Sequence, residues 1–247
     1  MKKLAFLLFC TIIIIFSGAA AQTTDSSALK AHYLKVYDQA LVYNDVNAAI
    51  NALHGYIAID NNLLYKDTMS MLYFSIKLYY SALILSEEVY KKLPTNIEAM
   101  ARAADCYDEL GDSKTSVSLF EQVCPKTKNV YHYYKLALGQ YQLKRTAECE
   151  ATIKIIMADS NSKKTGVNFQ MGDGSRQAVP LIAAAANLLG VMQMDLKNYE
   201  AGKAYFKQAL AFFPQFGGAQ QNMKICEDKT KPTVKGPVKT PANKPKG

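Results

Sequence analysis

Histidine and cysteine are the residues whose metal-binding roles are easiest to recognise in a sequence, and here their spacing does not fit a metal site. The three histidines lie far apart, and none is joined to acids at a metal-ligand spacing. No pair of cysteines forms C-x-x-C, and the wide, irregular spacing matches no zinc site. We therefore predict no metal site and interpret the cysteines as small core residues, with disulfides an open alternative in an oxidising compartment. The residues concerned are His32, His54, His132, Cys106, Cys124, Cys149 and Cys226.

A serine–lysine combination in a polar stretch is the one further trace of catalytic chemistry. Ser160 and Lys163 form S-x-x-K, and Lys-Thr-Gly follows at once at 164–166. In the serine enzymes that use both elements, they come from distant parts of a much larger domain, whereas here they touch. No G-x-S-x-G, H-E-x-x-H or P-loop pattern occurs. We predict that the protein is not an enzyme and has no catalytic residues and no cofactor. A hydrolase that uses the 160–180 segment is the least favoured alternative.

The first residues have the composition of a secretory signal. Lys2 and Lys3 supply charge, 4–16 are apolar, and Ala19–Ala21 offer a cleavage site. The apolar run is shorter than the roughly 20 residues that span a bilayer, and no later segment reaches that length. We predict a signal peptide at 1–21, a short linker at 22–28 and no transmembrane span. The protein is expected to be exported, periplasmic or extracellular, with outer-membrane association left open.

The formal charge of +8 is concentrated at the two ends of the chain. Two lysines belong to the start, and six lie from Lys229 onward in a segment without acids, which leaves the body near zero. A nucleic-acid surface would need positive charge on the folded body, so nucleic acid is not an expected partner. The segment 229–247 is rich in Lys and Pro and has little to bury, so we predict a disordered tail. Electrostatic contact of this tail with acidic envelope polymer or lipid is one interpretation, and a solubilising terminus is the other.

Between residues 28 and 161, apolar residues recur every three or four positions, which predicts amphipathic helices. The stretch from Asn198 to Pro214 also grades its apolar residues by size. Gly202 is followed by Phe206 and then Ala209. A small residue lets a partner helix approach closely, and a large one fills the volume that crossing helices leave.

With the preceding Leu189-Gly190 pair, this stretch resembles the tetratricopeptide repeat (TPR), a helix-turn-helix unit of about 34 residues. Weaker copies place Tyr107 and Gly111, and then Leu138-Gly139, at corresponding positions. The chain departs from the pattern in having no Trp, and its first two units lack the Leu-Gly pair. The resemblance implies an all-α fold, a right-handed superhelical array of antiparallel helix pairs with about five repeats over 29–228. The predicted units are 29–62, 63–96, 97–130, 132–165 and 183–216.

Residues 160–182 form an insertion that is too long for a turn between repeats. Val167, Phe169 and Met171 alternate with polar residues, and Asp173-Gly174 is a hairpin turn signal. A β-hairpin and a disordered loop are both compatible with this pattern. After it, a short amphipathic stretch is expected to cap the array with Met223 and Ile225 facing inward.

The resemblance further implies a concave groove lined by the first helix of each pair. It favours a scaffold or adaptor that binds a protein or peptide in the cell envelope, and no set of residues for gripping a C-terminal carboxylate is present. Glycan binding on a TPR-like scaffold is the alternative function. The residues predicted to line the groove are Asp67, Met71, Phe74, Arg102, Asp105, Asp108, Tyr133, Gln140, Asn187, Val191 and Met194.

Overall fold

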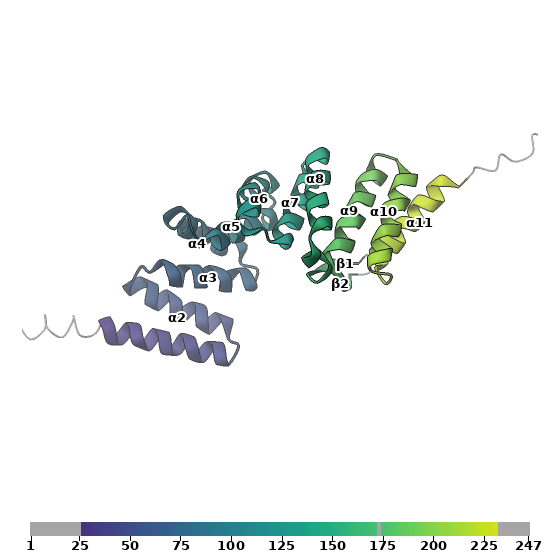
Figure 1. Cartoon of the computed structure of the whole chain (residues 1–247). Coiled ribbons are helices and arrows are strands. Elements are labelled where there is room, and N and C mark those ends of the chain that lie inside the picture. The colour runs from purple at the N-terminus through teal and green to yellow at the C-terminus, as the bar shows by residue number, and fades with distance from the viewer. Residues whose placement is uncertain (1–25, 172–173, 232–247) are drawn as a thin grey trace, which may run out of the picture. The chain divides into compact units, whose positions relative to one another are not determined.

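The computed structural model describes residues 26–171 and 174–231 (Figure 1). The predicted signal peptide and residues 232–247 of the predicted tail lie outside them. By their contacts the residues separate into two compact units, one ending at Lys128 and the other starting at Asn129. Both consist of helix pairs, as the sequence predicted.

Unit 1 contains three consecutive helix pairs. Aspartate or asparagine precedes four of its helices, and its side-chain oxygen accepts a backbone N–H of the first turn, as Asp45 does from Ala48 at 2.9 Å. Asn62, Asn96 and Asp112 cap the later helices in the same way. The helices are 26–42, α2 Val46–Ile59, α3 Leu63–Ser75, α4 Tyr79–Lys92, α5 Ile97–Glu109 and α6 Ser113–Thr127.

Unit 2 contains two helix pairs separated by the insertion and followed by one more helix. Its core is formed around α9, whose residues 181–190 are all buried. The elements are α7 Val130–Gln142, α8 Thr146–Ala158, the short 3₁₀ turn η1 Ser160–Lys163, β1 Gly166–Gln170, β2 Arg176–Pro180, α9 Leu181–Asp195, α10 Tyr199–Phe212 and α11 Gly217–Thr230.

The turn inside each of the five pairs has one geometry. In the α7–α8 turn, the N–H of Lys144 donates to the carbonyl of Tyr141 at 3.0 Å, and that of Arg145 donates to Gln140 at 2.9 Å. This pair of bonds is typical of a helix end at which the residue after the C-cap is left-handed. Here Leu143 is the C-cap and Lys144 has a φ of 59°. The same two bonds and a positive φ recur at Asn44, Lys77, Gly111 and Lys197. Five identical turns confirm the predicted repetition, although the sequence had indicated a turn glycine only at Gly111.

The size grading that the sequence showed is a packing device between α9 and α10. A Cβ on Gly190 would lie 2.4 Å from Cε1 of Phe206, so only glycine leaves room for the buried ring. A Cβ on Gly202 would lie 3.3 Å from the carbonyl oxygen of Gly190 and from Sγ of Cys226. Gly202, Phe206 and Ala209 are all buried, which confirms their predicted role at the contact between helices.

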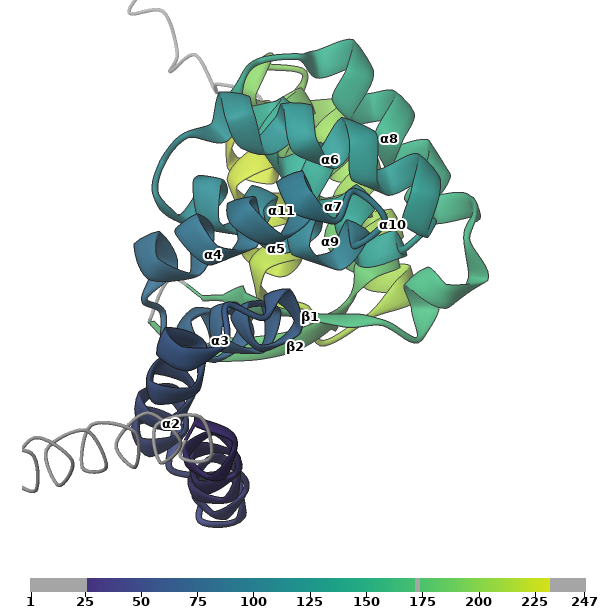
Figure 2. The same ribbon diagram turned by 90° about the vertical axis from the view of Figure 1, so that its left-hand side faces the viewer.

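The insertion is a β-hairpin, so the first of the two alternatives is confirmed. Strands β1 and β2 pair antiparallel with Asn168 opposite Ala178. Figures 1 and 2 place the hairpin at one end of the helices of unit 2. Its inner face rests on the start of α11, where the ring of Phe169 stands edge-on to that of Phe216 at 4.9 Å between centroids. Gln177 adds two hydrogen bonds, to the carbonyl of Gln215 at 2.6 Å and from the N–H of Gly217 at 3.2 Å.

Three sequence predictions differ from the structure at the ends of the domain. Residues 26–28, predicted to be linker, are helical, and α11 extends to Thr230 rather than ending at 228. On α11, Met223 packs against the core as predicted, but Ile225 is 39% exposed and Cys226 is fully buried instead. The contacts of α11 with the hairpin and α10 set its rotation, and those with the hairpin join residues 40 positions apart, such as Gln177 and Gly217.

Candidate protein-binding site

Two of the predicted groove residues of unit 1, Asp67 and Arg102, form an ion pair with each other. Both terminal nitrogens of Arg102 donate to Oδ1 of Asp67, at 2.9 and 2.7 Å, and Asn96 donates to Oδ2 at 2.9 Å. The two charged side chains are only 10% and 18% exposed. The structure brings together Asp67 on α3 and Arg102 on α5, which were both predicted to line the groove, but their charges satisfy each other.

The other predicted residues of unit 1 differ in how accessible they are. Asp105 and Asp108 are half-buried on α5, and both already have interaction partners. Phe74 is half-buried and stands edge-on to Tyr79 at 5.5 Å between ring centroids. Met71 is 56% exposed, so it is the predicted residue of unit 1 that a partner meets most readily.

In unit 2 the predicted groove residues are mostly interior. Gln140 is 4% exposed and accepts from Thr152 at 2.8 Å, and Asn187 is 3% exposed and accepts from Asn222 at 3.2 Å. Both side chains therefore hold helices together in this structure. The remaining three, Tyr133, Val191 and Met194, are half-buried against the core.

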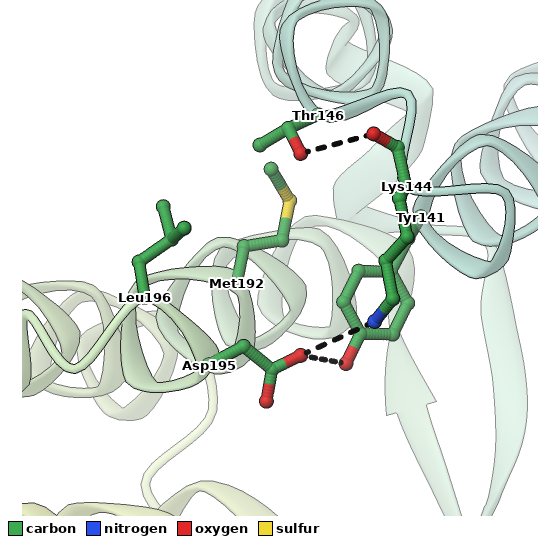
Figure 3. A pocket seen from close by; sticks show the side chains of 6 residues that line it. All are labelled: Tyr141, Lys144, Thr146, Met192, Asp195 and Leu196. Atoms are coloured by element: carbon green, nitrogen blue, oxygen red, sulfur yellow. Dashed lines mark hydrogen bonds and ion pairs between the residues drawn. The ribbon is translucent and has the colours of Figure 1, made fainter.

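A cleft at the end of α9 is a second candidate site in unit 2, separate from the predicted groove residues (Figure 3). Its volume is about 210 Å³, and it lies between the α7–α8 turn and the last turn of α9. The repeated turn geometry positions its walls, because Lys144 is the left-handed residue two positions after the end of α7 and Leu196 directly follows α9. The residues that line this edge cleft are Tyr141, Lys144, Thr146, Met192, Asp195 and Leu196.

The polar side of this edge cleft is centred on one carboxylate. Tyr141 donates its hydroxyl to Oδ2 of Asp195 at 2.6 Å. Burial, followed by this hydrogen bond, raises the pKa of Tyr141 to about 12, so the phenol remains a donor at neutral pH. Nζ of Lys144 lies 4.0 Å from the same oxygen and 5.3 Å from the centre of the Tyr141 ring. Lys144 is 78% exposed and Asp195 is 46% exposed, so this pair is weakly held and open to water.

The apolar side of the cleft is partly open as well. Leu196 is 56% exposed, whereas Met192 at the base is 3% exposed. An aromatic face, an oriented carboxylate and an aliphatic wall together suit a cationic side chain. The charge would meet Asp195 and the ring of Tyr141, and the carbon stem would meet Leu196.

None of the cleft's six residues was predicted from the sequence. The signal that could have found them is the repeated Leu-Lys dipeptide, Leu143-Lys144 and Leu196-Lys197, which marks two of the five turns. Within residues 26–171 and 174–231, no group of three His, Cys, Asp or Glu side chains could hold a metal. The thiols of Cys106, Cys124, Cys149 and Cys226 are free and buried.

A family model for the tetratricopeptide repeat matches residues 183–216, which contain most of α9 and all of α10. The chain carries a tetratricopeptide repeat. The matched range is the fifth unit predicted from the sequence, the one with the Leu-Gly pair and the graded second helix. Among curated proteins, none matches the chain.

Solved TPR structures align with most of the chain. MamA aligns with a TM-score of 0.60 at 15% identity, covering 72% of this chain and 94% of its own. YrrB, described as a TPR protein with an unusual peptide-binding site, aligns with 0.65 at 11%, covering 84% and 97%. A TPR protein from Parabacteroides merdae ATCC 43184 aligns with 0.64 at 12%, covering 82% and 73%. At these identities the likeness shows the fold, a TPR solenoid of helix pairs, which confirms the predicted fold class.

Proposed function

We propose that this protein is a noncatalytic, exported TPR scaffold that binds a segment of a partner protein, and that the edge cleft receives a basic side chain of that segment. The TPR fold supports a protein-interaction scaffold in general, and TPR scaffolds are generally noncatalytic. The observation that carries the finer proposal is the half-exposed carboxylate of Asp195, which the Tyr141 hydroxyl orients beside the exposed side chain of Leu196.

The charge around the cleft supports a basic rather than an acidic guest. Lys144 pairs with Asp195, and at 4.0 Å its ammonium makes a loose ion pair. A guest lysine or arginine can replace it at the carboxylate while Lys144 swings into water. Met71 is a second contact point in this proposal, on unit 1, because it offers exposed apolar area there.

Export and the tail belong to the same proposal. Within the described residues 26–171 and 174–231, none of the helices is long and apolar enough to span a bilayer. The proposed signal at 1–21 would deliver the protein to the envelope, where the lysine-rich tail would contact acidic polymer or lipid. Flotation with anionic vesicles across a salt series tests the tail, using the chain with and without residues 232–247. Equal retention of the two chains would remove the tail from the proposal.

The scaffold proposal is tested by identifying partners through chemical crosslinking in intact cells and then measuring their affinity for purified variants. Asp195→Asn keeps the shape of the cleft and removes its charge, so the affinity should fall by about tenfold, the usual scale for one charged contact. Glu200→Gln is the matched control, because Glu200 is exposed on the following helix and pairs with Lys203 at 3.1 Å. Equal affinity of the wild type and Asp195→Asn would exclude the cleft, and binding on a glycan array instead of to protein would favour the glycan alternative.

A further inference from the structure

The hairpin of unit 2 leaves one strand edge open. Hydrogen bonds run from the N–H of Met171 to the carbonyl of Ser175 at 2.8 Å and from Leu181 to Thr165 at 2.9 Å. Met171 with Ser175 and Thr165 with Leu181 are therefore hydrogen-bonded pairs of the ladder. Because bonded and non-bonded pairs alternate in an antiparallel ladder, Val167 and Phe169, which lie between them, also bond to β2. The N–H and C=O groups of Gly166, Asn168 and Gln170 therefore point away from β2. These three residues are exposed, and no hydrogen bond to them is found among the described residues.

The two edges of this sheet are not equally protected. Proteins block free strand edges with charged side chains and proline. The outward residues of β2 include Arg176 and Pro180, and proline has no N–H to donate. The outward residues of β1 are one glycine and two uncharged amides. The edge of β1 is thus the one that can accept another strand.

The body of unit 2 holds this edge in place. The inner face of the hairpin is fixed by the ring contact of Phe169 with Phe216 and by the two hydrogen bonds of Gln177. A Cβ on Gly218 would lie 2.8 Å from the Phe169 ring, so the contact is close. A preorganised edge loses little conformational freedom when a strand is added, which favours binding.

The charges near the edge decide what the added strand can be. Lys163 and Lys164 precede β1, and Arg176 lies across from Gln170 at its far end. All three are exposed and form no ion pair with any residue in the described ranges. A second copy of this hairpin would bring the same cations to the edge, and the chain's own tail is rich in Lys and Pro. Both occupants are disfavoured by like charge, and the tail also lacks donors at its prolines.

We propose that the edge of β1 binds an extended segment of a partner protein, which adds a third strand and carries acidic residues at its ends. The acidic ends reach Lys163, Lys164 and Arg176, and the middle of the segment exchanges main-chain hydrogen bonds with Gly166, Asn168 and Gln170. This rests on the proposed scaffold function but uses a surface other than the edge cleft.

The test uses two synthetic peptides, Ac-DEVTVTVED-NH₂ and Ac-KKVTVTVKK-NH₂, titrated into the full chain and followed by amide NMR and hydrogen exchange. The acidic peptide should bind at least about tenfold more tightly, since like charges oppose the basic one. Exchange of the Asn168 and Gln170 amides should slow on binding, while Val167 and Phe169, which are already bonded inward, should not change. Equal affinity for the two peptides, or unchanged exchange at Asn168 and Gln170, would overturn the proposal.

Two matched variants separate the edges. Asn168→Pro removes an outward N–H from β1 without touching the inward ladder, and affinity for the acidic peptide should fall at least about tenfold. Ala178→Pro makes the same change at the cross-strand position on β2 and should leave affinity unchanged. Equal loss in both variants would contradict an edge specific to β1. The peptide comparison on the wild type needs no variant, so it tests the proposal even where a variant misfolds. Loss of partner binding by Asp195→Asn with no effect of Asn168→Pro would keep the scaffold proposal and exclude this one.

Discussion

Replacing Gly190 by alanine tests the close contact between α9 and α10. The new Cβ would lie between 2.4 and 2.8 Å from three carbons of the Phe206 ring, which is fully buried. Overpacking in cores costs about 1–3 kcal/mol, and this contact is at the severe end. Alanine in place of glycine inside a helix returns about 1 kcal/mol. We expect a net loss of about 2 kcal/mol of unfolding free energy, or a fall in Tm of about 4–8 °C for a chain of this size.

Thermal and urea unfolding followed by far-UV circular dichroism measure this loss. Phe206→Leu removes the ring, so in that background Gly190→Ala should become neutral or stabilising by up to about 1 kcal/mol. Ala204→Gly, at an exposed position of α10, calibrates helix propensity alone and should cost about 1 kcal/mol. If Gly190→Ala changes stability equally with Phe206 and with leucine there, the close-contact explanation is refuted.

Three further predictions concern other contacts. Phe169→Ala removes the ring contact with Phe216 and should destabilise the packing of α11 on the hairpin by about 2 kcal/mol. Amide hydrogen exchange in α11 should become faster, and unchanged exchange would contradict a role of this contact in holding α11. Asp67→Asn should cost about 1–3 kcal/mol in urea unfolding, because it leaves the nearly buried Arg102 without its charged acceptor; a neutral effect would show that the pair is incidental. The folded pKa of Tyr141, about 12, lies above its ordinary 10.0, so its contribution to stability is complete below pH 10 and is lost as pH rises toward 12. The wild type should therefore lose more stability than Tyr141→Phe between pH 9 and 11.5, and parallel curves would contradict this.

The helix pairs could be predicted because their signals are local. The spacing of apolar residues and the graded series Gly202, Phe206 and Ala209 fixed the register of the last pair, and Pro214 marked its end. Lysine at the left-handed position of a turn was not predictable, because glycine is the residue usually found there. Lys77, Lys144 and Lys197 take this conformation within a turn geometry that all five pairs share.

The candidate site was less predictable because its residues meet across long separations in sequence. Asp195 is more than fifty residues from Tyr141, and the sequence contains no sign that the two side chains meet. For the same reason Asn187 was predicted to line a groove, whereas Asn222 of α11 covers it. Asp67 and Arg102 were both predicted to line the groove, but nothing in the sequence indicated that they pair with each other.

Photocrosslinking in intact cells tests the central claim, that the edge cleft on a TPR scaffold binds a partner protein, most directly. A photoreactive phenylalanine in place of Leu196, which is 56% exposed at the cleft, should yield a defined crosslinked protein that Asp195→Asn diminishes. The same probe at Ile155, 49% exposed on α8, is the control and should yield no such product. No crosslink at Leu196, or the same product from both positions, would contradict the account.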